Sequence, residues 1–483
     1  MGTGNLKRLA EPSLMTMSVP ALSLIRKFPV EVWEECWSHL NARDLQELCL
    51  VCQLFRSLCQ PRIFHHLDFS SPYPEDIGDD DWEDEARSLL KSASRFKHLA
   101  DSDVRHHVRS WDFSGFCEEI LDSDEFDIQN TELLLQAYHC AVQAFILSLG
   151  SFSDLRSICC NFIDVTPRLL DILASLPRLD ELSLHSCLVV GQTANTLSIR
   201  TLCIGDISWI DETPTPIPLV SSRTLESLTM GSYKGALRLL PPLLSNGIFS
   251  NLVHFRLILP ASIHNIFFDI LRTCSNLHTL DIESPDAMNN HYILPSDVIP
   301  SLRVYRGPLS LAESLVAGRP VHEVHLGTNH GVAHGRMPVS VASLLSTFSW
   351  ISGTSVALRD LKLPLMYPNF EVFHAVAKLF PCLVNLTITV LGNTKDEPTG
   401  PQVPHDREEG SSSVPTGTDA SKSVFLHIPN GDGENPDFPN RTTSSIEVST
   451  VALNEDGLPV RTADSFTVRF PFLFLRFSAL MKR

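Results

Sequence analysis

LPRLDELSLHSC, residues 176–187, contains a six-residue frame of the form apolar-x-x-apolar-x-apolar. Leu179, Leu182 and Leu184 occupy its apolar positions. The alternation at the end of the frame is typical of a short strand with one buried face, because successive side chains of a strand point to opposite sides. One such triplet arises by chance in any sequence, so the inference depends on whether it returns at a fixed interval.

The same frame returns at a nearly constant interval. From residue 155 to residue 302 its successive copies start 24, 20, 26, 27, 25 and 25 residues apart. Repeat units that combine one strand with one helix are about 20–29 residues long. This regularity predicts an array of stacked repeats, and two weaker copies precede it, around Leu67 and Trp111. The central apolar residues of the regular copies are Ile158, Leu182, Leu202, Leu228, Phe255, Leu280, Tyr305, Val324, Leu361 and Leu386.

The segments between the frames have helical periodicity. In residues 165–176, 262–274 and 369–380 the apolar side chains recur at three- and four-residue steps. A lone strand or helix cannot bury its apolar side, but stacked repeats do so by placing parallel strands on a concave face and helices on a convex face. We therefore expect an α/β solenoid, an irregular horseshoe over residues 104–390, with the apolar stretch 132–149 packed against its first repeats.

Residues that alternate with the buried positions of the frame face the concave side, and most of them are polar. Such a face either binds a protein substrate or is simply solvated. For the face as a whole we favour binding of a protein substrate, whose identity the sequence does not give. The candidate substrate-binding residues are Glu181, His185, Arg256, Asp281, Glu283, Arg306, Glu323, His325 and Lys362.

A separate helical module is expected before the array, in residues 22–60. Pro29 follows an apolar anchor, Phe28, and suits the first turn of a short helix. A second helix is predicted to start near Asp44 and to continue through Leu58. About 40 residues make a marginal core by themselves. Because both helices have apolar surface on more than one side, part of it must meet the rest of the chain or a partner.

This module resembles the F-box. The resemblance is carried by FPVE at 28–31, SHL at 38–40 and DLQELCLVCQLF at 44–55, followed by Arg56 and Leu58. Phe28 stands for the usual Leu, and Cys36 and Trp37 stand where aliphatic residues or Phe are usual. The resemblance implies docking on the Skp-type adaptor of a cullin ubiquitin ligase. The residues it assigns to the helices or to the adaptor interface are Phe28, Pro29, Val32, Trp37, Leu40, Leu45, Leu48, Val51 and Cys52.

The two parts together resemble F-box proteins with divergent leucine-rich repeats, a form common in fungi. Cys187 stands where such repeats carry Asn or Cys, although the Asn ladder is mostly absent. The resemblance implies a substrate-recognition subunit of a cullin-type ubiquitin ligase. The alternative is a non-ligase interaction scaffold in which the F-box-like helices cap the solenoid.

Charge and composition restrict the function further. The net charge of the 483-residue chain is −18, and residues 68–127 hold 18 acidic and 6 basic side chains, a net of −12. Nucleic-acid binding is not expected, because it depends on clustered Lys and Arg. No secretory signal or membrane span is expected either, and twelve scattered cysteines do not form a disulfide framework. These features favour a protein of the cytoplasm or nucleus.

No catalytic chemistry is expected in this chain. Phosphate-binding glycine loops, the GxSxG nucleophile elbow and the HExxH zinc motif do not occur in the sequence. Cys49 and Cys52 are spaced as CxxC, but they have no second pair at finger spacing and lie on a predicted helix. We therefore expect no catalytic residues, metal or cofactor. The expected segments are a flexible tail at 1–21, an F-box at 22–67, an acidic linker at 68–103, the solenoid at 104–390, a disordered loop at 391–422 and a C-terminal segment at 423–483 with strands that cap the array.

Overall fold

The computed structural model describes residues 28–390 with nine internal gaps, together with three short strands near the C-terminus. The gaps are residues 73–76, 78–80, 117–127, 191–194, 210–218, 246, 284–293, 328–339 and 366–368. The predicted tail at 1–21 and the predicted loop at 391–422 lie outside the described residues, as does most of the segment 423–483.

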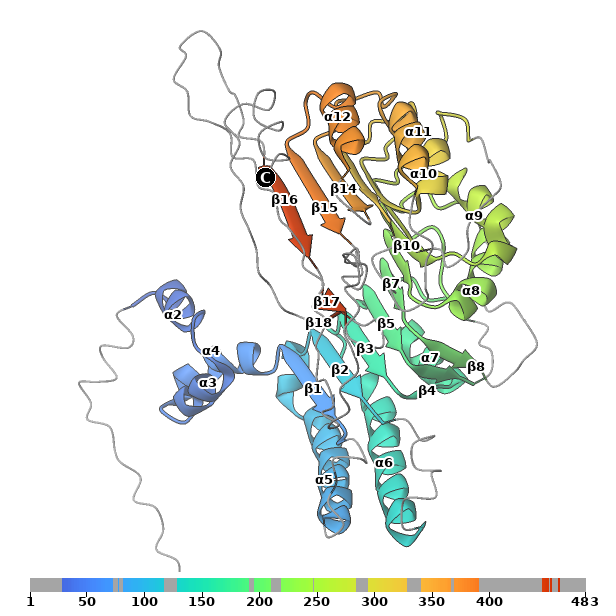
Figure 1. Ribbon diagram of the computed structural model, residues 1–483. Helices are drawn as coiled ribbons and strands as arrows, with labels where there is room; N and C mark the ends of the chain where they lie inside the picture. Colours follow the sequence, from blue (N-terminus) through green and yellow to red (C-terminus); the bar gives the residue numbers. More distant parts are fainter. Residues whose placement is uncertain are drawn as a thin grey trace, which may run out of the picture.

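A single parallel sheet of thirteen strands runs through the molecule (Figure 1). Neighbouring strands of this sheet follow one another along the chain, apart from short flanking strands, so each strand pairs with the strand of the next repeat. This is the expected α/β solenoid. The strands are β1 (His66–Ser70), β2 (Ser110–Ser114), β3 (Ser157–Asn161), β5 (Glu181–His185), β7 (Thr201–Ile204), β9 (Ser227–Met230), β10 (His254–Ile258), β11 (Thr279–Glu283), β12 (Val304–Gly307), β13 (Glu323–Leu326), β14 (Asp360–Leu365), β15 (Asn385–Val390) and β16 (Ser445–Thr450).

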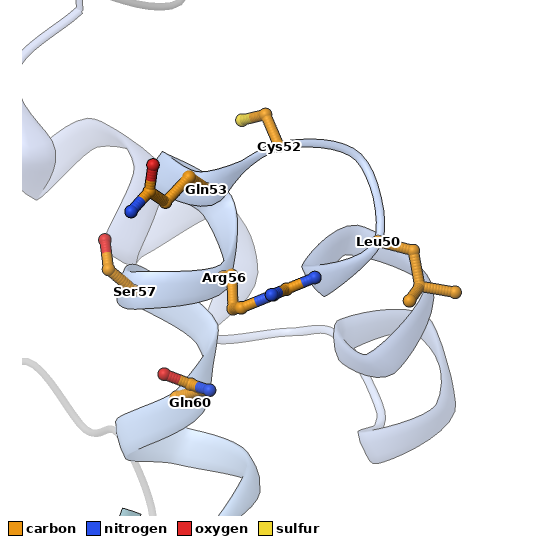
Figure 2. A pocket seen from close by; sticks show the side chains of 6 residues that line it. All are labelled: Leu50, Cys52, Gln53, Arg56, Ser57 and Gln60. Carbon is orange, nitrogen blue, oxygen red and sulfur yellow. The ribbon is translucent and has the colours of Figure 1, made fainter. Parts of the chain in front are cut away.

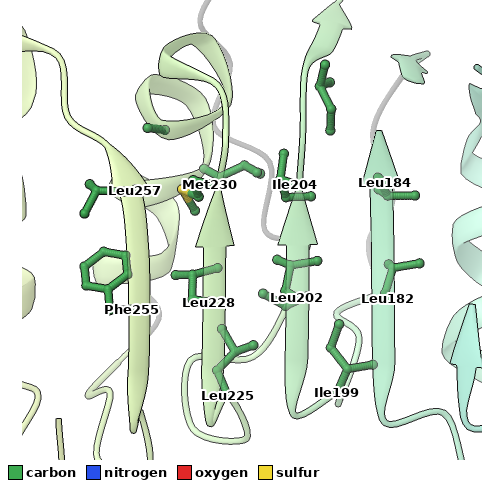
Figure 3. Packing of buried hydrophobic residues seen from close by; sticks show 14 of the residues in the cluster. Leu182, Leu184, Ile199, Leu202, Ile204, Leu225, Leu228, Met230, Phe255 and Leu257 are labelled. Carbon is green, nitrogen blue, oxygen red and sulfur yellow. The ribbon is translucent and has the colours of Figure 1, made fainter. Parts of the chain in front are cut away.

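The frame found in the sequence sets the register of this sheet. Leu182 pairs with Leu202 and Leu202 with Leu228, so central frame residues stand opposite one another on adjacent strands. Figure 3 shows these leucines level with one another on one side of the sheet. All three are fully buried. The predicted strands are therefore confirmed, and each one buries its frame because the stack supplies a like neighbour on either side.

Helices cover one side of the sheet and bury the same apolar face (Figure 1). The predicted helices at 165–176, 262–274 and 369–380 are present as α7, α9 and α12. The helices of the array are α5 (Trp82–Asp101), α6 (Ile128–Leu149), α7 (Pro167–Ser175), α8 (Tyr233–Ser245), α9 (His264–Leu271), α10 (Leu309–Val316), α11 (Val341–Ile351) and α12 (Phe370–Leu379), with short 3-10 helices η2 (Asp103–His107) and η4 (Ala261–Ile263).

The predicted acidic linker at 68–103 is wrong for most of its length. Residues 82–101 form α5, a helix of 20 residues whose apolar side lies in the main core. Trp82, Leu89 and Phe96 are buried there, while the acidic residues of the first turn stay outside. Acidic side chains suit a helix N-terminus, so the charge run hid a regular repeat. The solenoid accordingly begins at β1, before residue 104, and β1 overlaps the expected end of the F-box at 67.

Helix α6 is strongly apolar along most of its length. Residues 131–149 are the one described segment long and apolar enough to cross a membrane by length and composition alone. In the structure this segment packs beside α5, and Leu134, Phe145 and Leu149 are fully buried in the main core. The helix therefore uses its apolar side within the array, as the sequence predicts for residues 132–149.

A smaller sheet of three parallel strands lies beside the early repeats: β4 (Asp164–Val165), β6 (Cys187–Val189) and β8 (Ile207–Trp209). Cys187 is fully buried, and its thiol donates to the Cys160 carbonyl of the preceding repeat at 3.3 Å. The cysteine thus joins successive repeats, which accounts for its place directly after the frame.

At the other end of the array, the predicted strand at 445–453 is present as β16, which pairs in parallel with β15, followed by β17 (Ala452–Leu453). β17 pairs with β18 (Pro459–Val460). The predicted strand at 423–428 and the apolar stretch 466–477 lie outside the described residues.

A buried arginine between α10 and β13 links the end of α10 to the loop before β12. Arg319 is 1% exposed, and its guanidinium donates five hydrogen bonds to backbone carbonyls. The carbonyls belong to the loop that precedes β12 and to the end of α10, so one side chain joins two segments. Its acceptors are the carbonyls of Leu294, Pro295, Val298, Ser314 and Ala317, at 2.8–3.4 Å.

The N-terminal module consists of three helices: α2 (Val30–Trp37), α3 (Ala42–Cys49) and α4 (Gln53–Ile63). The expected single helix from Asp44 through Leu58 is therefore wrong, since the chain breaks between α3 and α4. Cys52 is extended there, and its sulfur caps α4 by accepting from the Phe55 amide at 3.4 Å. The break ends one helix and lets the next one fold back on it.

Candidate protein-docking surfaces

The helical module has a core of its own. Trp37, Leu45, Phe55 and Cys59 are buried together, apart from the main core of the array. The rings of Trp37 and Phe55 meet edge to face at 4.9 Å, an arrangement that adds to the stabilisation from burial. The sequence assigns Trp37 and Leu45 either to the helices or to the adaptor interface. Both side chains are buried inside the module, so their assignment to the adaptor-binding residues is wrong, and they build the helices.

Other apolar residues of the module face outward. Phe28 before α2, Val32 on α2 and Val51 in the α3–α4 connection are exposed, which a docking residue requires. Pro29 is exposed too. The remaining predicted docking residues are half-buried against the module core: Leu40, Leu48 and Cys52.

Sequence reasoning missed the most prominent of these outward residues. Leu50 is 80% exposed, the largest exposed fraction among the large apolar side chains of the described residues. Leu54, four residues further on, is exposed too, and so is Val30 at the start of α2. The signal was present in the run Leu50–Leu54, where apolar residues stand on both sides of the helix break. We name the exposed residues Phe28, Val30, Val32, Leu50, Val51 and Leu54 the module face.

A hollow of about 420 Å³ lies at this connection (Figure 2). The Arg56 side chain lies along its floor and donates from Nε to the Cys49 carbonyl at 3.4 Å. Leu50, Cys52 and polar side chains surround it, so the hollow can accept a side chain from another polypeptide. Its lining residues are Leu50, Cys52, Gln53, Arg56, Ser57 and Gln60.

The module stands beside the first strand of the array and is not covered by it (Figure 1). Helix α4 packs on α3 within the module and leads directly into β1, and among the described elements outside the module it also contacts the 3-10 helix η2. The two apolar cores do not merge. Within the described part of the chain, the module face therefore stays open to solvent.

The concave face of the array consists of aligned rows of side chains, one from each strand. In the central row, Arg256 of β10 pairs with Asp281 of β11, which pairs with Arg306 of β12. His325 of β13 and Lys362 of β14 continue it. From β1 to β15 the central row is Asp68, Asp112, Cys159, Ser183, Cys203, Thr229, Arg256, Asp281, Arg306, His325, Lys362 and Thr387.

Strands β10–β14 bring most of the predicted substrate-binding residues together as a network of charges. Arg256 donates to Glu283 at 2.8 Å and lies 3.7 Å from Asp281. Arg306 donates to Glu323 at 2.9 Å. We name Arg256, Asp281, Glu283, Arg306, Glu323, His325 and Lys362 the charged strip.

Burial and charge fix the protonation of the strip. Burial lowers the pKa of His325 to about 4, and nearby Lys362 adds to this effect, although Glu323 opposes it. Burial by itself would raise the pKa of Glu323, but the hydrogen bond from Arg306 and the neighbouring positive charges leave it below its usual value. His325 is thus a neutral imidazole near pH 7, with its Nε2 3.1 Å from the Glu323 carboxylate.

Two predicted substrate-binding residues need correction. Glu283 and His325 are each only 8% exposed, so a partner on the concave face does not meet them first. Each has a partner within the strip, Arg256 for Glu283 and Glu323 for His325. Buried polar groups are stable when they have polar partners. A polar residue that alternates with the core positions of the frame can therefore itself be buried.

The earlier strands carry the other predicted residues, Glu181 and His185 on β5. Glu181 is exposed, and the ring of His185 lies over Gly205, where a side-chain Cβ would stand 2.3 Å from Nδ1. Cys203 is 3.9 Å from His185 Nε2. Cys159 and Cys203 both face this side and were missed, because cysteine in an apolar frame reads as a core residue.

No group of three or more His, Cys, Asp or Glu side chains in the described part of the chain is placed to hold a metal ion. The described cysteines are all free thiols. Burial raises the pKa of the Cys187 thiol to about 11, which disfavours the reactive thiolate there.

Comparison with known proteins adds no identification: no family model matches the chain, and neither does any curated protein. The fold and the two surfaces define an α/β solenoid-like array with a small helical module at its start.

Proposed function

We propose that this chain is the substrate-recognition subunit of a cullin-type ubiquitin ligase. In this proposal the module is an F-box that docks on a Skp-type adaptor, and the array is a set of divergent leucine-rich repeats whose concave face holds the target protein. The observation that carries the proposal is the open module face, a set of exposed apolar side chains on α2, α4 and the chain next to them, in a unit whose core is separate from that of the array.

Several features support adaptor docking. Exposed apolar patches rimmed by polar residues are typical of protein–protein contacts. The module face and the hollow lie on one small, independently packed unit, and Leu50 belongs to both. The resemblance of residues 28–58 to the F-box then gives the partner its class.

The mechanism is proximity. The module holds the ligase, the concave face holds the target, and target lysines are kept near the ubiquitin-carrying enzyme at a raised effective concentration. Because the array and module are joined directly through α4 and β1, a target on the sheet is kept at a short distance from the adaptor. No chemical step is assigned to this chain.

The test is co-purification of the full chain with the adaptor. Leu50→Asp together with Leu54→Asp places two charges on the module face and leaves its four core residues in place. The matched control is Leu90→Asp on α5, which is also an exposed leucine but lies on the array. We expect wild type and control to retain the adaptor and the double variant to lose it. Equal retention by all three would refute the proposal.

The contact between α4 and η2 supports a second candidate, a scaffold whose helices only cap the array. In that case neither wild type nor any variant retains the adaptor. In that case the double variant would also lower the thermal stability of the array no more than the Leu90 control, since Leu50 and Leu54 lie outside the core of the array.

A further inference from the structure

The positive groups of the charged strip occur on alternate strands. Arg256 lies on β10, Arg306 on β12 and Lys362 on β14, in one row of the register. Neighbouring strands are about 4.8 Å apart, so these backbone positions are spaced by about 9.6 Å and span about 19 Å. The two intervening positions of the row hold Asp281 and the neutral His325.

The carboxylates of the strip lie deeper than these cations. The side chains of Arg256 and Arg306 are 43% and 37% exposed, whereas those of Glu283 and Glu323 are 11% and 23% exposed. Each carboxylate orients a guanidinium from beneath. Arg306 Nε is buried and has no acceptor among the residues that the structure describes. A partner on the concave face therefore first meets three positive groups, which come from alternate strands.

We propose that the strip binds an acidic target segment in the polyproline II conformation, with a carboxylate at every third residue. This conformation has three residues per turn and rises about 3.1 Å per residue, so every third side chain lies on one face at intervals of about 9.3 Å. Three such carboxylates span about 18.6 Å, against about 19 Å between the backbone positions of the three cations. The inference rests on the target-holding part of the proposed function and specifies its substrate class.

Other regular conformations fit the strip less well. An extended strand rises about 3.3 Å per residue and presents every second side chain, so its same-face positions fall near 6.6 and 13 Å. In an α-helix the position seven residues on lies about 10.5 Å away, so over two steps the mismatch grows to about 2 Å. The regular alternation of cations thus favours the threefold repeat.

The test measures binding of labelled peptides to the full chain by fluorescence anisotropy. The first peptide repeats Pro-Pro-Glu over about 15 residues and forms polyproline II. The second has the same composition, with no two glutamates three or six residues apart. The third replaces Glu by Gln. A helical peptide with Glu at every seventh residue is the fourth. We expect the first to bind at least tenfold more tightly than the others.

Variants of the chain locate the binding. Lys362→Gln removes an exposed charge, and Arg306→Gln removes the central one; each is expected to weaken binding of the first peptide about tenfold, in line with loss of one charged contact. Arg306→Lys retains the charge and is expected to recover part of it. The control is Lys234→Gln on α8, an exposed lysine on the other side of the sheet, which should leave binding unchanged.

The outcomes separate the two proposals. Equal binding of the first two peptides, tighter binding of the helical one, or binding that survives Lys362→Gln would overturn the inference, and Lys362 is exposed enough that this variant leaves the fold intact. If the inference fails while the adaptor still co-purifies, the proposed function stands. If the adaptor is not retained but the first peptide binds selectively, the strip is a peptide site outside a ligase.

Discussion

Replacing Arg319 tests how strongly one buried side chain stabilises the array. Arg319→Met removes five hydrogen bonds to carbonyls of two segments and leaves those carbonyls without their donor. Hydrogen bonds from a charged group contribute about 1.5–3 kcal/mol each, but removing a buried charge recovers several kcal/mol of desolvation. The balance predicts a loss of about 3–5 kcal/mol, comparable to breaking a buried ionic contact.

Burial lowers the pKa of Arg319, which is the sign of that desolvation. Arg319→Lys keeps a charge but has three donors on a single nitrogen, so it cannot serve five carbonyls; we expect a loss of about 2 kcal/mol. The measurement is urea unfolding followed by circular dichroism. The control is Arg359→Met, an exposed arginine on the same array, expected to change stability by less than about 0.5 kcal/mol. Arg319→Met unfolding at the same urea concentration as this control would refute the reasoning.

Three further predictions concern pH, packing and the module. The folded-state pKa of His325 is about 4, below its ordinary value of about 6.5. The unfolded chain therefore takes up a proton at a higher pH than the folded chain, and the stability falls as the pH drops from 6.5 towards 4. His325→Gln should flatten this part of a pH–stability curve. Gly205→Ala places a Cβ against the His185 ring and should cost about 1–3 kcal/mol, with most of that loss absent when His185→Ala is present as well, as thermal melts would show. Trp37→Ala empties the module core and should reduce adaptor retention through loss of helical structure, whereas the Leu50→Asp and Leu54→Asp double variant reduces it with an unchanged circular dichroism spectrum; loss of helix in both would contradict the division between core and face.

The repeats could be predicted from the sequence because their signal is local. Each frame fits within six residues, and the stack aligns the frames one to one, so Leu182 and Leu202 needed no knowledge of the rest of the fold. The first repeats were harder to predict. In α5 the acidic residues of the first turn make the segment resemble a charged linker, although Leu89 and Phe96 further along it belong to the core.

Burial of polar groups could not be predicted from the frame. Glu283 and His325 occupy positions that alternate with the core, and only their partners from neighbouring strands explain why they are buried. Arg319 is a similar case, since a lone arginine after a helix reads as a surface residue until the five carbonyls around it are known. Its acceptors are up to 25 residues away in the chain, beyond the reach of any periodic pattern.

The separate cores of the module and the array have a consequence for damaged copies of the protein. A substitution confined to Trp37, Leu45, Phe55 or Cys59 melts three short helices, while the thirteen-stranded stack retains its own packing. If the proposed function holds, such a copy still binds the target but no longer binds the adaptor. It would protect its target from ubiquitination. Because it competes with the intact protein for the same target, such a variant is expected to be dominant negative.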